Sequence, residues 1–456
     1  MKFIFKNEFS NGVICANKTD PKPFSDWDLK PVRMNIQMNY WKKFTAEERL
    51  DRVQRALKDN VDFSKDANLG YPASKLDERV FANESIFLRE MPVLNTYIAN
   101  PNHIGCHTYG TSEYSFKGTQ AVEREVLNMI AVDLFKIGEG EFDGYISPGG
   151  TEANLQALWI YRNEFMKKRG AKLEEIAILA SEDAHYSIPK GANVLMLDLV
   201  SVPVHPDTRE LSIDAIFHAV RNAIKSGKKY FIVISNLGST MFGSVDDPEH
   251  FSTVLRSLDV PYRIHIDGAY GGFLYPFGDH ESRINFQNPD ISSITIDAHK
   301  MLQAPYGTGI FVCRKGLIEF VVTKEAKYVE GLDLTLCGSR SGANAVAVWI
   351  ILTTYGPHKW FEKISVLKMR TNWLCKQLDE LAIPYFREPQ MNIVAIRSSA
   401  IPKSVAQKFN LVPQSHDESN LWYKIVVMDH VEIEHLKDFM EVLKSSKIND
   451  AAGIIS

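Results

Sequence analysis

The sequence is poor in cysteine, in long apolar runs and in net charge. Its five cysteines are scattered without a C-x-x-C pair, which argues against a disulfide framework or a zinc knuckle and is typical of a reducing cytosol. A net charge of -4 provides no basic field for nucleic acid or for an anionic membrane surface. The longest apolar stretch, 345–352, falls far short of the roughly 20 residues that a membrane span needs. The first ten residues also lack the apolar run of a signal peptide. We therefore expect a cytoplasmic protein without nucleic-acid, membrane or metal partners.

The pattern of apolar residues beyond about Gly144 predicts an α/β domain. Short, continuously apolar runs alternate there with amphipathic stretches. Strands of this kind are buried on both faces, which is typical of a mostly parallel sheet covered by helices. The predicted strands are 176–180, 194–199, 230–235, 264–267, 294–297 and 309–313.

A length of 456 residues exceeds one ordinary domain, so we expect a division into three parts. Residues 1–95 would form an N-terminal arm with helices, one of them opened by a capping box at Thr45 and Glu48. Residues 96–340 would form the large α/β domain, including a helix with Val122 and Val126 on its apolar face. Residues 341–456 would form a smaller α+β domain, with helices over 343–355 and 360–381 followed by strand, helix, strand and helix.

Lys300 is the first candidate for chemistry. It ends the run Asp297-Ala298-His299-Lys300, directly after a predicted strand. A lysine that points from a strand end into a cleft loses solvation, so its pKa falls and it becomes able to form a Schiff base. Taken alone, a lysine after a strand is more often a solvated loop residue.

Asp267 is the second candidate, because it is an acid at the end of an apolar strand and precedes small residues. A carboxylate buried at that depth needs a cationic partner, and the N–H of a pyridinium ring would provide one. Capping of the following turn is the alternative. His265 lies two residues earlier and therefore faces the same way. It either supports the aspartate or is a satisfied core histidine.

Two further blocks suit a phosphorylated aromatic cofactor. Gly149, Gly150 and Thr151 precede an amphipathic helix, and a glycine-bearing helix start can bind phosphate through its backbone N–H groups and dipole. The block lacks the lysine and the glycine spacing of ATP and NAD sites. His185 follows the strand 176–180 and could lie flat on an aromatic ring, although a lone histidine there is more often structural.

These four blocks occur together in the order and spacing of the group II, fold-type I pyridoxal-phosphate decarboxylases, which the sequence resembles from about Asn68 onward. The resemblance extends to the blocks 236–240, 338–342 and 391–395, and it is closest to the archaeal tyrosine/aspartate decarboxylases and the plant serine decarboxylases. It implies an aspartate-aminotransferase-like α/β fold with a smaller α+β C-terminal domain. It also implies pyridoxal 5'-phosphate (PLP) as the cofactor of the large domain, and an obligate homodimer with a shared active site.

The resemblance implies a role for each matching residue around the cofactor ring. Lys300 would carry the internal aldimine, and Asp267 would pair with the pyridine nitrogen. His185 would stack on one face of the ring, while Ala269 would pack against the other. Thr240 would lie near the O3' side of the ring.

The remaining implied roles concern the phosphate and the proton. Gly150, Thr151 and His299 would hold the phosphate, and Ser339 would reach the phosphate of the neighbouring subunit. Tyr328, the only tyrosine in the loop 323–336, would protonate Cα after carbon dioxide leaves. The alternative for Tyr328 is a surface residue on a flexible loop.

The leading hypothesis is thus an L-amino-acid α-decarboxylase. A carbon–carbon lyase of the sphingosine-phosphate lyase type shares the 338–342 block but usually needs a lipid substrate. An aminotransferase would place the proton on C4' rather than Cα. A cofactor-binding protein without activity is disfavoured by the intact set of Lys300, Asp267 and His185. The sequence does not name the amino acid; His103 and His107 are either substrate contacts or ordinary loop histidines.

Overall fold

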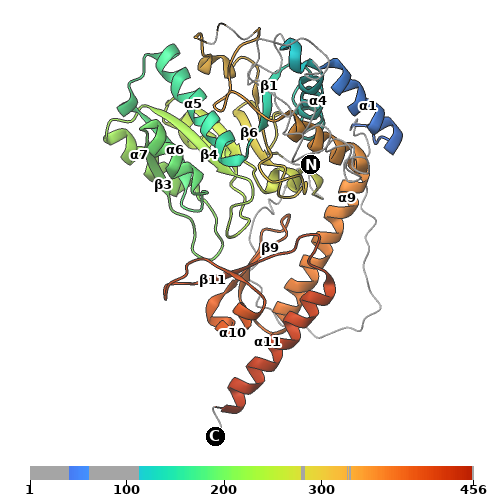
Figure 1. Cartoon of the computed structure of the whole chain (residues 1–456). Helices are drawn as coiled ribbons and strands as arrows, with labels where there is room; N and C mark the ends of the chain where they lie inside the picture. The colour runs from blue at the N-terminus through green and yellow to red at the C-terminus, as the bar shows by residue number, and fades with distance from the viewer. Residues whose placement is uncertain (1–40, 61–111, 279–282, 326, 328–329, 454–456) are drawn as a thin grey trace, which may run out of the picture.

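A computed structural model of the chain describes residues 41–60, 112–278, 283–325, 327 and 330–453. Figure 1 shows two lobes joined by the long helix α9 (Gly342–Glu380). The upper lobe contains a seven-stranded sheet covered by helices, and the lower lobe contains a four-stranded sheet. Residues 1–40 and most of 61–119, which the sequence predicts to be arm and loop, lie outside the described part of the chain. The division into 1–95, 96–340 and 341–456 stays a prediction.

The seven-stranded sheet has the order β1-β7-β6-β5-β4-β2-β3. Strands β3, β2, β4, β5 and β6 run parallel, whereas β7 is antiparallel to both of its neighbours. This architecture confirms the predicted mostly parallel α/β fold. The strands are β1 (Phe142–Ser147), β2 (Ile176–Ser181), β3 (Asp198–Val202), β4 (Tyr230–Asn236), β5 (Tyr262–Asp267), β6 (Ile291–Asp297) and β7 (Gly309–Arg314).

Burial on both faces explains why these strands read as unbroken apolar runs. In β2, Ile178 packs with the cluster that contains α5 (Gly150–Arg169) and α6 (Ser187–Leu195). Its neighbour Leu179 packs on the opposite face, with the cluster that contains α7 (Ile213–Lys225) and α8 (Pro248–Ser257). Because successive side chains point to opposite faces, both must be apolar.

The structure corrects the strand predictions at two places. The predicted strand 194–199 is wrong in its first half, because Val194 and Leu195 end helix α6 and the strand begins only at Asp198. Strand β3 lies at the edge of the sheet and is mostly exposed, so its apolar pattern is weak. Strand β1 was not predicted. It contains the buried residue Asp143. Its carboxylate accepts the N–H of Gly316 (2.8 Å), which compensates for the loss of solvent.

The helices on the N-terminal side match the predicted pattern. Helix α1 (Ala46–Asp59) begins with the predicted capping box, in which Thr45 Oγ1 accepts Glu48 N–H (3.1 Å) and Glu48 accepts Thr45 N–H (2.7 Å). Helix α4 (Lys117–Asn128) carries Val122 and Val126 in the core and continues as the π-helical segment η3 (Met129–Leu134). The short 3-10 helices are η2 (Tyr114–Phe116), η4 (Leu173–Glu175), η5 (Gly271–Phe273), η6 (Tyr275–Phe277), η7 (Ile318–Val321) and η8 (Ser398–Ala400).

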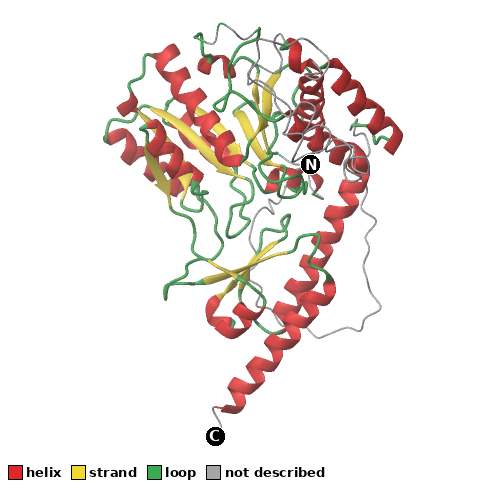
Figure 2. Cartoon of the chain, in the orientation of Figure 1, coloured by secondary structure: helices red, strands yellow, loops and turns green. Residues whose placement is uncertain are grey.

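The lower lobe is α+β, as predicted. Helix α9 is interrupted at Gly356 (φ 66°) and Pro357, which gives the two predicted helical segments. The sheet has the order β10-β11-β9-β8 and is antiparallel. Figure 2 shows this sheet beside the helices of the lobe. Its elements are β8 (Tyr385–Phe386), β9 (Ile393–Arg397), α10 (Lys403–Lys408), β10 (Val412–Pro413), β11 (Trp422–Val426) and α11 (Ile433–Gly453). No helix in the described residues is both long and apolar enough to cross a membrane.

A buried ion pair fixes the strand that leads into helix α5. Arg340 pairs with Glu123 of α4, and both side chains are almost fully buried. The same two side chains bind the backbone of Ile146 in β1: Glu123 accepts its N–H (2.7 Å) and Arg340 donates to its carbonyl (3.1 Å). The pair therefore joins α4, β1 and the segment before α9.

We predict that Glu123→Gln strongly destabilises the fold, because it leaves the Arg340 guanidinium buried without a counter-charge. Breaking such a pair costs about 3–5 kcal/mol. The double variant Glu123→Gln/Arg340→Gln should lose less stability than the single variant, because no uncompensated charge remains. Thermal unfolding followed by circular dichroism measures both. Lys359→Gln, which breaks the exposed Lys359–Glu362 pair, serves as a control, and a single variant as stable as this control would contradict the prediction.

Candidate active site

Two adjoining cavities lie where the carboxyl ends of the parallel strands meet the start of helix α5. Their volumes are about 310 Å³ and about 420 Å³. Four residues line both cavities, namely His185, Ala269, His299 and Lys300. The first cavity also contains Thr240 and Asp267, and the second contains Gly150 and Thr151. The structure thus brings together eight of the residues that the sequence predicts for the site.

Lys300 lies in the turn that follows β6. Its Nζ is 3.0 Å from Asp297 Oδ2, and its side chain is about one-third exposed. Asp297 itself is buried, and its Oδ1 has no hydrogen-bond partner among the described residues. The amine therefore faces both cavities while an ion pair holds it in place.

Asp267 ends the central strand β5 and is 5% exposed. Its Oδ2 accepts a hydrogen bond from Asn154 Nδ2 (2.8 Å), and its Oδ1 accepts the N–H of Ala269 (3.2 Å). These two hydrogen bonds fix the orientation of the carboxylate. Asp267 is therefore suited to bind a cationic N–H that enters the first cavity.

His185 lies between the two cavities. Its Nδ1 receives the N–H of Ser187 (3.2 Å) and lies 2.9 Å from the hydroxyl of the same residue. Burial lowers the pKa of His185; Asp267 acts against this shift and Lys300 adds to it. A neutral imidazole can lie against an aromatic ring without losing the solvation of a charge.

The start of helix α5 forms a narrow cradle. Gly149 has φ 145°, a backbone conformation that residues with a side chain rarely adopt. A Cβ on Gly150 would lie 2.9 Å from both carboxylate oxygens of Asp297. His299 Nδ1 lies 2.9 Å from the carbonyl of Thr308, so this nitrogen carries a proton and Nε2 faces the site. Backbone N–H groups at such a helix start bind an anion.

These residues fit PLP. Lys300 provides an amine for its aldehyde, Asp267 a carboxylate for its pyridine nitrogen, and the glycine-bearing helix start a cradle for its phosphate. The unpartnered Asp297 Oδ1 is a buried acceptor at the same place. The fit is one of chemistry and position, from residues that three separate segments of the chain supply.

One predicted residue is not brought into this cluster: Ser339 is exposed and is not among the described residues that line either cavity. Tyr328, His103 and His107 lie outside the described residues.

The sequence analysis missed three residues that the structure places at the site. Asn154 and Ser187 are buried and bind Asp267 and His185. Lys424 comes from strand β11 of the lower lobe and donates to the carbonyl of Thr240 (2.8 Å). Burial lowers the pKa of Lys424, and the nearby Lys300 lowers it further. Its signal in the sequence is one lysine inside an otherwise apolar strand.

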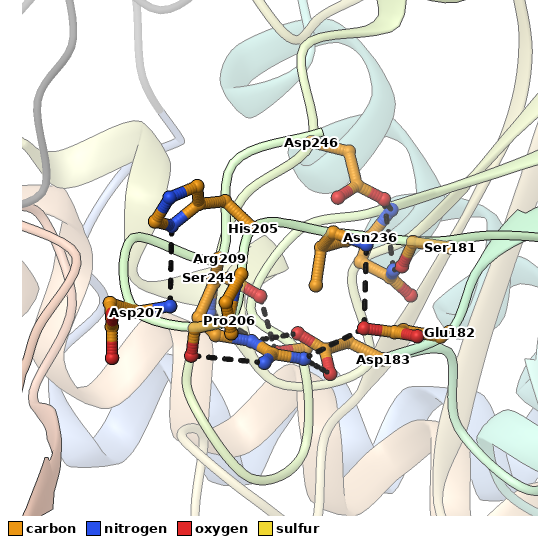
Figure 3. Close-up of polar contacts among 12 residues, drawn as sticks. Ser181, Glu182, Asp183, His205, Pro206, Asp207, Arg209, Asn236, Ser244 and Asp246 are labelled. Carbon is orange, nitrogen blue, oxygen red and sulfur yellow. Dashed lines mark hydrogen bonds and ion pairs between the residues drawn. The ribbon is translucent and has the colours of Figure 1, made fainter. Parts of the chain in front are cut away.

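A buried polar cluster supports the floor of the first cavity (Figure 3). Asn236 lines the cavity at the end of β4 and donates to Ser181 Oγ (2.9 Å) and to Asp246 Oδ2 (2.9 Å). Burial raises the pKa of Asp246 to about 7. Beside them, Arg209 binds the carboxylate of Asp183. These contacts hold the ends of β2 and β4 in register beneath the site.

Comparisons with known proteins agree with this geometry. Residues 102–366 match the family model described as "Pyridoxal-dependent decarboxylase conserved domain". The chain is 49% identical over 407 residues to the tryptophan decarboxylase of Clostridium sporogenes, covering 89% of this chain and 98% of that protein. It is 31% identical to the "Probable L-tyrosine/L-aspartate decarboxylase" of Methanococcus maripaludis over 73% of this chain and 85% of that one. The resemblance to the archaeal tyrosine/aspartate decarboxylases is therefore confirmed, but the identity is lower than to the tryptophan decarboxylase.

A solved structure supports the fold. The tryptophan decarboxylase of Catharanthus roseus in complex with L-tryptophan superposes with a TM-score of 0.65 at 14% identity, over 90% of this chain and all of that one. The family match and the 49% identical relative show more than a shared fold. The chain therefore belongs to the pyridoxal-dependent decarboxylases and is a PLP-dependent amino-acid decarboxylase.

Proposed function

We propose that the protein decarboxylates L-tryptophan to tryptamine. The observation that carries this proposal is the 49% identity to a tryptophan decarboxylase over nearly the whole of both chains. The first cavity supports it, because the wall facing Lys300 includes the apolar side chains of Ile393, Val426 and Met428 together with Tyr270. Such an apolar and aromatic wall suits an indole ring.

The roles proposed for the ring contacts rest on the family resemblance and on the residues that line the cavities. When bound, PLP supplies an electron sink for the pair of electrons that the departing carbon dioxide leaves on Cα. Lys300 Nζ would hold the cofactor through its aldehyde and would give way to the substrate's amine. Asp267 would keep the pyridine nitrogen protonated, which makes the sink effective. His185 and Ala269 would hold the ring between them.

The remaining residues are proposed to contact the phosphate and the O3' side of the cofactor, or to supply the proton. Gly150, Thr151 and His299 bind the phosphate, and Thr240 lies on the O3' side. Tyr328 remains the predicted donor of a proton to Cα.

We also propose a homodimer in which Ser339 reaches the partner's phosphate. Its support is the rim of the second cavity, where Tyr306 (91% exposed), Tyr186 and Leu336 present apolar surface. Apolar side chains grouped at the mouth of a site are typical of a surface that another chain covers. A cytoplasmic location also stays a prediction, and it rests on the cysteine usage.

Lys424 is suited to bind the α-carboxylate of the substrate. It is a cation that the lower lobe contributes to the first cavity, and its Nζ donates to the carbonyl of Thr240 (2.8 Å). A cation at the carboxylate orients the bond that breaks, but it also stabilises the bound substrate. It should therefore contribute more to binding than to rate.

The first prediction concerns the substrate. The purified chain with PLP should release tryptamine and carbon dioxide from L-tryptophan, with a higher kcat/KM than for tyrosine, phenylalanine, aspartate or glutamate. Amine detection by liquid chromatography across these five amino acids measures this. A higher kcat/KM for aspartate or glutamate would contradict the proposed specificity, and an oxo-acid product would contradict decarboxylation.

The second prediction concerns Lys300. Lys300→Arg keeps the cation beside Asp297 but removes the amine, so tryptamine formation should fall by at least on the order of 100-fold. After reduction with borohydride, mass spectrometry should no longer find the cofactor covalently attached to the peptide that contains residue 300. Lys315→Arg, on an exposed lysine that binds Gly140, is the matched control. Cofactor fixed elsewhere in Lys300→Arg would show that another lysine holds it.

The third prediction concerns Lys424. Lys424→Met should raise KM for tryptophan by about 10-fold, which corresponds to one charged hydrogen bond, with a smaller change in kcat. Inhibition by tryptamine, which has no carboxylate, should be unchanged. Lys437→Met, on an exposed lysine of α11, is the control. Equal weakening of tryptophan and tryptamine would assign Lys424 a structural role instead.

A further inference from the structure

A chain of buried side chains runs through the interior of the upper lobe and ends at the candidate site. Tyr161 donates to Ser293, whose hydroxyl lies 2.7 Å from His265 Nδ1. The other ring nitrogen of His265, Nε2, lies 3.0 Å from Asn154 Oδ1. Asn154 Nδ2 then donates to Asp267 Oδ2 (2.8 Å). All five residues are buried.

The carboxylate at the end of this chain determines its direction. Because a carboxylate only accepts, the NH2 group of Asn154 must face Asp267, and the opposite orientation would place two oxygens 2.8 Å apart. Asn154 Oδ1 therefore accepts a hydrogen bond from the N–H at His265 Nε2. Burial lowers the pKa of His265 to about 3, so the ring is neutral and its Nδ1 accepts from Ser293. Every donor in the chain thus points toward Asp267.

Asn154 has a second contact, which leads to His185. Its Nδ2 also donates to Ser187 Oγ (3.1 Å). Since this hydroxyl already accepts from Asn154, its own proton is free to point to His185 Nδ1, 2.9 Å away. The Ser187 N–H reaches the same nitrogen (3.2 Å). A nitrogen that receives two donors carries no proton, so the proton of a neutral His185 ring is on Nε2.

We propose that Asn154 is the positioning residue of the site, because one amide orients the Asp267 carboxylate and, through Ser187, holds His185 as the Nε2–H tautomer. The proposal rests on the proposed function only in that Asp267 and His185 contact the cofactor. Asn154 would orient both residues before the cofactor binds. An asparagine that merely filled the core would have the same burial but no effect on either partner.

The test compares four forms of the full chain: wild type, Asn154→Leu, Asn154→Asp and the matched control Asn163→Leu. Asn163 lies on the same helix, and its amide donates to a backbone carbonyl, that of Phe320 (3.1 Å), away from the site. The first measurement is the affinity of the cofactor-free protein for PLP at pH 8. Circular dichroism checks that each variant is folded.

Asn154→Leu should weaken PLP binding by about 10- to 100-fold. This is the loss of affinity typical when a residue that orients the direct ligands of a site is removed. Asn154→Asp matches asparagine in volume, but it should bind PLP no better than the leucine variant, since its carboxylate opposes Asp267. A purely structural Asn154 would give the reverse order, with aspartate tolerated better than leucine. PLP binding by Asn154→Leu that equals that of Asn163→Leu would overturn the proposal.

The second measurement needs no cofactor. Nitrogen-15 spectra of labelled histidine, assigned with His185→Gln, should show His185 as the Nε2–H tautomer in the wild type. In Asn154→Asp the Ser187 hydroxyl is drawn to the new carboxylate, so the Nδ1 signal of His185 should move. An Nδ1–H tautomer in the wild type, or identical His185 signals in both proteins, would overturn this half of the proposal. A wild type that binds PLP but does not decarboxylate tryptophan would instead contradict the proposed function and leave this inference standing.

Discussion

A carboxylate buried at the end of the central strand is the constraint on which the site depends. Asp267 lies in the middle of the sheet, where the desolvation of a charge costs several kcal/mol unless donors or a cation compensate it. Within the protein the compensation comes from the amide of Asn154 and the N–H of Ala269. Among the described residues no cation forms an ion pair with Asp267. A site built in this way suits a ligand with a positively charged N–H.

The two lobes contribute different parts of this site. The parallel strands β4, β5 and β6 bring Asn236, Asp267 and the Lys300 turn to one edge, and helix α5 begins beside them. The lower lobe adds Lys424 and an apolar wall. One contact between the lobes lies near this wall: Arg397 of β9 pairs with Asp207 of the upper lobe. Within the lower lobe, the same guanidinium lies over the ring of Trp422 (3.9 Å). The cofactor end is therefore upper-lobe structure, while the substrate end is shared.

The predicted cofactor residues that line the cavities occur in short blocks of the sequence. The Asp267 and Lys300 blocks each directly follow an apolar strand, and a residue after a parallel strand has only one edge of the sheet to occupy. Asn154 and Lys424 could not be found in this way, because their roles depend on partners 113 and 184 residues distant. Ser187 contacts His185 two residues away, but it also depends on Asn154, 33 residues distant. The weak edge strand β3 and the polar strand β1 were misjudged for a related reason, since their pairing partners, not their own composition, make them strands.

The sequence by itself determined the fold class and the cofactor and made decarboxylation the leading reaction, because the strand pattern and the lysine, aspartate and glycine blocks are local features. Only the tertiary structure decided how the site residues are held. Asn154 and His265 lie 111 residues apart, yet they form one hydrogen-bonded chain. The orientation of Asp267 and the tautomer of His185 follow from the two hydrogen bonds that the Asn154 amide donates. They are properties of donors and acceptors that meet only in the folded protein, so no pattern along the sequence encodes them directly.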